Sequence, residues 1–267
     1  MSLSPGKEQG RQVIYVQSET PIAVAHHSYS SVTTPIEKQI LTKGLGFKDP
    51  MGAGAHRGQA VETGVVQGLL DHNASVESCI KLAEKKYQLA TMMEPLTAAD
   101  VQRNRGVIAP MVEALIKELR PYGIPEMGVD GQKKITINLD GVKRPIIGFL
   151  DLFYPAHGLI VDIKTTLRMP AKITDSHGLQ GAIYSHGVGG NYEVRFVYAS
   201  DKKCVAYQQN NVREKLEEFR LRTIHREHLL DLYPTWEELA QVTTPNYDSF
   251  FMSGPEMRQA GKIVWGY

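Results

Sequence analysis

Apolar residues recur every three or four positions along the first half of the chain, which is the spacing of amphipathic helices. A short helix is expected to open at Thr34, where a capping residue precedes a proline. Longer helices are expected over 59–71 and after Ser75. A fourth helix should follow Thr97 and carry an apolar stripe made by Ile108, Met111, Val112, Leu115 and Leu119. The N-terminal half is therefore predicted to be helical.

Beyond residue 133 the spacing changes to the alternation and short apolar runs that are typical of strands. Strands are expected over 134–139, 146–154, 159–165, 192–199 and 204–208. A hairpin turn at Asp140 and Gly141 joins the first two. Two more helices are expected, one after Asp175 and a charged one over 212–230 with a mainly solvated face. This order predicts an α/β fold with a central mixed β-sheet flanked by helices.

Composition and charge limit the class of protein. The 267 residues include two cysteines, which is too few for an iron–sulfur cluster or a four-cysteine zinc site. The net charge is +1, so any DNA binding would depend on a local basic patch. Without an apolar run of roughly 18 residues or a secretory signal, the protein is expected to be cytoplasmic, with no membrane contact. Residues 1–24 lack periodicity and no linker follows, which predicts an extension and then a single domain over 25–267.

Two aspartates are expected to face each other across a hairpin. A four-residue loop over 155–158 sets the register of the two strands that it joins. That register places Asp151 opposite Asp162, with their Cβ atoms about 5 Å apart. Two carboxylates at that distance repel each other, and a bound divalent cation is the simplest way to offset the repulsion.

A lysine completes this candidate site. Lys164 lies two residues beyond Asp162 and should project from the same face, while Ile163 offers a backbone carbonyl between them. A metal-assisted hydrolase needs acidic ligands, a group that orients the attacking water, and positive charge near the reacting phosphate. A lysine beside acids stays mostly protonated, so it would orient water rather than act as the base. A solvated face with a local Asp162–Lys164 ion pair remains the alternative.

Five short motifs follow one another between residues 28 and 184. They read Ser-Tyr-Ser-Ser-Val from residue 28, Arg-Gly-Gln-Ala-Val-Glu from 57, Gly-Phe-Leu-Asp from 148, Val-Asp-Ile-Lys-Thr from 161 and Gln-Gly-Ala-Ile-Tyr from 180. In this order they resemble the motifs of the PD-(D/E)XK nuclease superfamily, in its RecB-type and lambda-exonuclease-like branch. The resemblance implies a restriction-endonuclease-like core and a metal-dependent DNA nuclease.

The chain departs from the RecB-type pattern at Glu62, where those enzymes place a histidine. Lambda-exonuclease-like enzymes carry a glutamate there, which favours an exonuclease of phage or prophage type. A glutamate at the margin of an apolar helix stripe can also be an ordinary solvent-facing residue, and this alternative stays open. Relatives with an iron–sulfur cluster are excluded because the chain lacks their cysteine cluster.

The resemblance also implies roles for individual residues. The catalytic set would be Glu62, Asp151, Asp162, Lys164, Gln180 and Tyr184. The ligands of Mg²⁺ or Mn²⁺ would be Glu62, Asp151, Asp162 and the carbonyl of Ile163. Contacts to DNA are expected from Arg57, Ser30, Arg168 and Lys172, with His177 adding positive charge to the same loop as the last two. Tyr184 as an ordinary half-buried tyrosine, and the loop as merely solvated, remain alternatives.

The expected activity is hydrolysis of phosphodiester bonds in DNA during recombination, repair or phage DNA metabolism, by an exonuclease. The expected partners are DNA, a phage single-strand annealing protein and further copies of the chain, in the cytoplasm of a bacterial host. The alternative is a catalytically silent accessory of the same fold that binds DNA in recombination or packaging. A nuclease for RNA or for structured substrates is a third reading of the same site.

Overall fold

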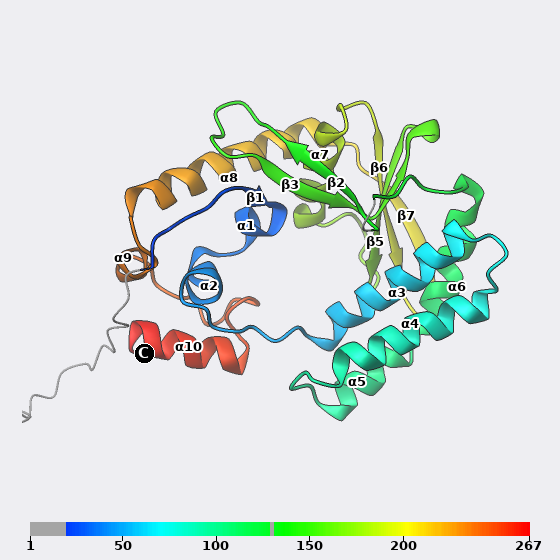
Figure 1. Ribbon diagram of the computed structural model, residues 1–267, viewed down its shortest axis with the longest axis horizontal. Coiled ribbons are helices and arrows are strands. Elements are labelled where there is room, and N and C mark those ends of the chain that lie inside the picture. Colours follow the sequence, from blue (N-terminus) through cyan, green and yellow to red (C-terminus); the bar gives the residue numbers. More distant parts are fainter. Residues whose placement is uncertain (1–19, 129–130) are drawn as a thin grey trace, which may run out of the picture. The chain divides into compact units, whose positions relative to one another are not determined.

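The computed structural model describes residues 20–128 and 131–267, and the chain forms two compact units (Figure 1). The larger unit comprises Ala25–Thr33 and Pro50–His225, and the smaller one comprises Thr34–Asp49 and Arg226–Tyr267 together with residues 20–24. Most of the predicted extension, residues 1–19, lies outside the described residues. The single domain over 25–267 stays a prediction, because one domain can contain two compact units.

Four helices of the larger unit lie in the segments that were predicted to be helical. They are α3 (Ala53–Leu70), α4 (Val76–Thr91), α5 (Ala98–Arg105) and α6 (Ile108–Leu119). Ser75 caps α4 by accepting a hydrogen bond from the Ser78 backbone N–H, and Thr97 caps α5. The expected single helix after Thr97 is wrong, because Gly106 and Val107 separate α5 from α6. Glycine is among the weakest helix formers, which explains the break.

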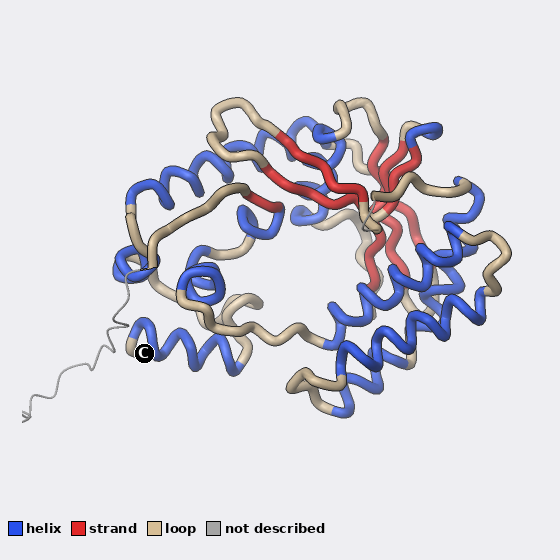
Figure 2. The backbone as a smooth tube through the Cα atoms, viewed as in Figure 1, coloured by secondary structure: helices blue, strands red, loops and turns tan. Residues whose placement is uncertain are grey.

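The strands form two sheets, drawn in red in Figure 2. The three-stranded sheet has the order β1 (His27–Ser28), β3 (Ile146–Leu150), β2 (Lys133–Ile137). The four-stranded sheet has the order β4 (Leu152–Tyr154), β5 (Leu159–Thr165), β6 (Glu193–Ala199), β7 (Cys204–Gln208). Each sheet contains one parallel pair, β1 with β3 and β5 with β6, and its other pairs are antiparallel. The predicted α/β class with mixed strand directions is confirmed, but the strands form two sheets in place of the single central sheet that was expected.

The long strand expected over 146–154 is interrupted at Asp151. A bend at this residue separates β3 from β4, so the two halves pair in different sheets. The predicted register of the following hairpin is confirmed, since Tyr154 pairs with Leu159 and Leu152 with Val161. Gly158 closes its loop in the left-handed conformation, at φ 60°, which glycine adopts without a steric cost.

Alternation along β5 divides its side chains between two layers. Val161 and Ile163 pack with α3, α4 and α6, whereas Ile160 packs with α7 (Asp175–Gly187). Asp162 and Lys164 share the face of Ile160, because side chains on a strand alternate. The helix α8 (Val212–Leu232) adds Phe219 to the core on that face. The expected solvated face of this charged helix is wrong at Glu227, which is 1% exposed, whereas His225 and His228 are exposed.

The smaller unit is helical. It contains α2 (Ile36–Gln39), a π-helical turn over Ile40–Gly44, α9 (Trp236–Gln241) and α10 (Pro255–Trp265), together with α8 from Arg226 onward. Ile40, Leu230, Trp236 and Leu239 form one of its apolar clusters. A Cβ at Gly44 would lie 2.4 Å from Trp236 Cγ, so this helical turn and α9 can approach only because residue 44 has no side chain.

Candidate functional site

The buried strand β5 carries an acid and a lysine on its α7 face. Asp162 is 1% exposed, and its Oδ2 lies 2.5 Å from Lys164 Nζ. Its other oxygen, Oδ1, is buried without a hydrogen-bond partner among the described residues. Burial raises the pKa of Asp162, and the ion pair with Lys164 opposes this shift only in part. A buried carboxylate oxygen with no donor is costly unless a ligand satisfies it.

Asp151 stands at the bend between β3 and β4, directly before the paired residues of the hairpin. Its Oδ2 accepts a hydrogen bond of 2.9 Å from the backbone N–H of Ile163. Burial raises the pKa of Asp151 well above its usual range, and the charges of Asp162 and Glu62 raise it further. The bend therefore places a second acid beside β5, but the ladder ends at Leu152 and Val161, so Asp151 is not the paired partner of Asp162 that the register predicted.

Glu62 on α3 is connected to Asp151 by Gln132, a residue that the sequence analysis did not single out. Gln132 Nε2 donates to Glu62 Oε1 at 2.7 Å and to Asp151 Oδ1 at 2.8 Å. Burial raises the pKa of Glu62, while the hydrogen bond from Gln132 lowers it. A glutamine directly before a strand carries no sequence signal for such a bridge. Its position depends on how β2 and α3 approach each other.

Gln180 and Tyr184 extend this set of hydrogen bonds along α7. Lys164 Nζ donates to Gln180 Oε1 and Gln180 Nε2 donates to Tyr184 OH, both at 3.0 Å. Burial alone would lower the pKa of Lys164, but the charges of Asp162 and Asp151 raise it. The lysine is therefore held as a cation in a fixed position.

The donor set suits a hard divalent cation. Mg²⁺ and Mn²⁺ prefer carboxylate and carbonyl oxygens. The pKa values of Asp162, Asp151 and Glu62 are all raised, and Oδ1 of Asp162 has no hydrogen-bond partner among the described residues. Within 20–128 and 131–267, however, no three His, Cys, Asp or Glu side chains are already arranged to hold an ion. The Gln132 amide lies between two of the acids. The residues thus fit a cation once this amide moves, and Ile163 as a ligand stays a prediction.

Arg57 does not join the acids. Its side chain is 4% exposed, and its guanidinium donates to Asn104 Oδ1 at 2.6 Å and to the Thr165 carbonyl at 3.2 Å. These bonds connect α3 to α5 and to the end of β5. The geometry favours a structural role for Arg57, and the predicted contact with DNA receives no support from it.

The other predicted DNA contacts lie on the surface. Ser30 is exposed on α1 (Tyr29–Thr33), and Arg168 and Lys172 are exposed in the loop between β5 and α7. Their roles stay predictions. His177 was expected to add positive charge, and this is wrong, because burial and the charge of Lys164 lower its pKa to about 4. Its Nδ1 lies 2.5 Å from Tyr198 OH instead.

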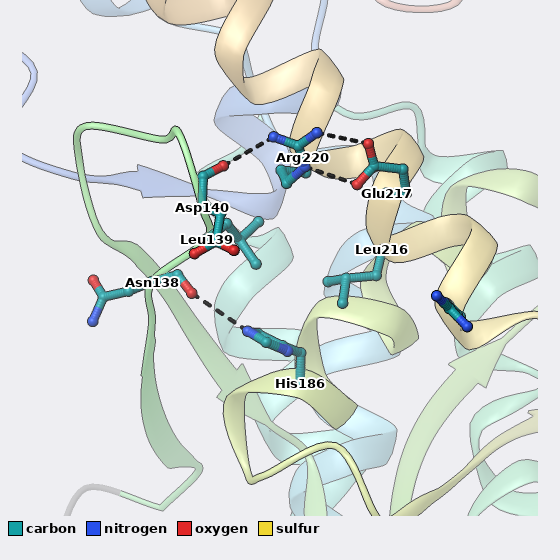
Figure 3. A pocket seen from close by; sticks show the side chains of 8 residues that line it. Asn138, Leu139, Asp140, His186, Leu216, Glu217 and Arg220 are labelled. Carbon is teal, nitrogen blue, oxygen red and sulfur yellow. Dashed lines mark hydrogen bonds and ion pairs between the residues drawn. The ribbon is translucent and has the colours of Figure 1, made fainter.

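Two cavities of the larger unit differ in the residues that line them. A cavity of about 580 Å³ opens beside the acids and is lined in part by Glu62, Lys86 and Gln132. A second cavity, of about 610 Å³, lies between α7, α8 and the β2–β3 turn (Figure 3). There Arg220 already donates to Glu217 through Nε and Nη2 and to the Asp140 carbonyl through Nη1. The first cavity is therefore the one that gives access to the candidate site.

Comparisons with known proteins leave the family open. No protein-family model matches the chain, and no curated protein matches it. The chain is similar to a solved structure titled "Crystal structure of SSO0001", with 15% sequence identity and a TM-score of 0.35 over 78% of this chain and 90% of the other. Among the described helices, none has the length and apolar character needed to cross a membrane.

Proposed function

We propose that this protein is a metal-dependent DNA nuclease with a restriction-endonuclease-like core. The observation that carries the proposal is the buried Asp162 carboxylate, which has one unpartnered oxygen and lies beside Asp151 and the cation of Lys164. A buried cluster of acids costs folding free energy, and a site for a divalent cation explains why the chain tolerates that cost. The order of the five motifs gives independent support.

The residues of the candidate site would have separate roles in the reaction. Asp162, Asp151 and Glu62 would hold Mg²⁺ or Mn²⁺, and the ion would polarise the phosphate and favour ionisation of water. Lys164 has a raised pKa, so it would orient the attacking water and stabilise negative charge that develops on the phosphate, rather than remove a proton. Gln180 fixes the position of this lysine through the 3.0 Å hydrogen bond.

The finer parts of the proposal are an exonuclease of phage or prophage type that acts on DNA ends in the cytoplasm of a bacterial host. A phage single-strand annealing protein and further copies of the chain would be its partners. Ser30, Arg168 and Lys172 would contact the phosphates of the DNA.

Purified protein incubated with end-labelled linear DNA and Mg²⁺ or Mn²⁺ tests the activity. The wild type should shorten the DNA, and Asp162→Asn should lower the rate by more than about 100-fold, because loss of a ligand should cost more than loss of a group that only supports one. The control Asp201→Asn changes an exposed aspartate in the β6–β7 turn and should keep full activity.

Undiminished shortening by Asp162→Asn would refute the assignment of the site. Wild-type protein that binds DNA without shortening it would favour the silent accessory instead. Circular and single-stranded substrates in the same assay distinguish an exonuclease from an endonuclease.

A further inference from the structure

Gln132 holds an unusual position between two acids of the candidate site. One nitrogen, Nε2, donates a hydrogen bond to each of two carboxylates, at 2.7 Å to Glu62 Oε1 and at 2.8 Å to Asp151 Oδ1. The amide group has two N–H donors, and both are used toward negative charge. The amide therefore presents its positive end where two carboxylates converge.

A divalent cation between the same two oxygens would need the same place. Mg²⁺ binds carboxylate oxygens at about 2.0–2.1 Å, so an ion that bridges Glu62 and Asp151 would overlap the amide nitrogen. An N–H donor also repels a cation. The ion and this arrangement of Gln132 consequently exclude each other, which agrees with the absence of a ready three-acid site within the described residues.

We propose that the Gln132 carboxamide is a placeholder for the divalent cation. It neutralises part of the repulsion between Glu62 and Asp151 in the metal-free protein, and the ion must displace it to bind. Gln132 is thus a positioning residue that sets metal affinity. This inference rests on the proposed function, because it assumes that these acids hold the ion.

The surroundings of Gln132 allow the exchange. Its side chain and that of Glu62 both line the cavity of about 580 Å³, so a hydrated ion can reach Glu62 and the amide from solvent. The same space can receive the amide when it leaves. A glutamine sealed in the core would have no such route.

Mn²⁺ binding to the full chain, measured by calorimetry together with melting temperatures without and with Mn²⁺, tests the proposal. Gln132→Ala removes both competing hydrogen bonds and should bind Mn²⁺ at least about tenfold more tightly, since a single charge-assisted hydrogen bond already corresponds to roughly that factor. Its metal-free form should melt at a lower temperature than the wild type. Gln132→Lys places a permanent cation between the acids, so it should bind Mn²⁺ at least about tenfold more weakly and melt higher without metal.

Gln67→Ala is the matched control. Gln67 lies on α3, lines the same cavity and is exposed, so its removal should leave Mn²⁺ affinity unchanged. Weaker Mn²⁺ binding by Gln132→Ala would show that the amide is a ligand and overturn the proposal. A lower melting temperature with unchanged affinity would show a purely structural role and overturn it as well.

The failure of this inference is distinguishable from the failure of the nuclease assignment. If the wild type binds Mn²⁺ and shortens DNA while Gln132→Ala matches its affinity, only the placeholder role is refuted. If the wild type binds no Mn²⁺, the metal site itself is refuted together with the placeholder.

Discussion

Asp162 and Asp151 determine most of the electrostatics of the candidate site. Both are acids with raised pKa values, and burial is the larger cause in each case. Lys164 offsets part of this cost, because it lies 2.5 Å from Asp162 Oδ2. Removal of one acid should therefore relieve repulsion and remove a ligand at the same time.

The first prediction at this scale uses Asp151→Asn. Saturating Mn²⁺ should stabilise the wild type, by about 2.7 kcal/mol at 100 times the dissociation constant, because only the folded chain forms the site. The asparagine oxygen can still accept the hydrogen bond from Ile163, but its amide nitrogen then faces Gln132. The ligand charge and the Gln132 bond are lost, while the repulsion from Asp162 and Glu62 is relieved. The metal-induced rise in melting temperature should shrink, while the metal-free variant should be no less stable than the metal-free wild type. Equal metal shifts in both proteins would show that Asp151 is not part of a metal site.

The second prediction concerns His177, whose folded pKa of about 4 lies below the ordinary value of 6.5. The unfolded chain binds the proton more readily between these two values, so wild-type stability should fall as the pH decreases from 6.5 toward 4. His177→Phe keeps a ring that can stack on Phe196 and removes this titration. The melting temperature of the wild type minus that of the variant should decrease over this window.

The acids with raised pKa values have the opposite effect on the free energy of unfolding, over an overlapping pH range. Their folded forms bind protons more readily, so they favour folding as the pH decreases. They are present in both proteins and largely cancel in the difference. A pH-independent difference would mean that His177 is not neutralised by burial.

Helices and strands approach each other closely at positions where a glycine has no side chain. A Cβ at Gly148 on β3 would lie 2.9 Å from Tyr184 Cε1 and 3.2 Å from Ile135 Cγ1. The approach of β3 to α7 therefore depends on this glycine. It gives the glycine of the Gly-Phe-Leu-Asp motif a packing reason that is independent of catalysis.

The third prediction compares two glycine-to-alanine substitutions. Gly148→Ala should lower the free energy of unfolding by about 1–3 kcal/mol, because buried Tyr184 and Ile135 must shift. Gly58→Ala on α3 would place its Cβ 3.4 Å from Thr165 Oγ1, which is an ordinary contact, and should stabilise by about 0.5–1 kcal/mol through helix propensity. Denaturant unfolding measures both values. A Gly148→Ala variant as stable as the wild type would contradict the close packing of β3 against α7.

Element prediction from the sequence succeeded where one face of an element is clearly apolar. The strand over 159–165 and the register of its hairpin are confirmed, because both follow from alternation and a short turn. The helix expected after Asp175 is also confirmed, although its cap is Thr174. The strand over 146–154 and the fourth helix were wrong at Asp151 and Gly106, where the periodic pattern continues but the chain bends. The helices α9 and α10 were missed.

Across the larger unit, the two sheets and the helices gather residues that are distant in sequence. Glu62 comes from α3, Gln132 from the residue before β2, and Gln180 from α7, while Asp151 and Asp162 come from the hairpin. Two apolar cores flank β5, one with α3, α4 and α6 and the other with α7 and α8. The candidate site lies at β5, which contributes side chains to both cores, as β4 and β6 also do.

The sequence by itself determined most helical and strand segments of the larger unit, the α/β class and the register of the hairpin after Asp151, because these depend on periodicity and on one short loop. Only the tertiary structure decided that Gln132 bridges two acids, that Arg57 is buried against Asn104 and Thr165, and that burial lowers the pKa of His177. Each of these three features arises because side chains from separate elements pack together and exclude water. Burial and charge at such meeting points have no local signature in the chain, since they arise only when the elements pack.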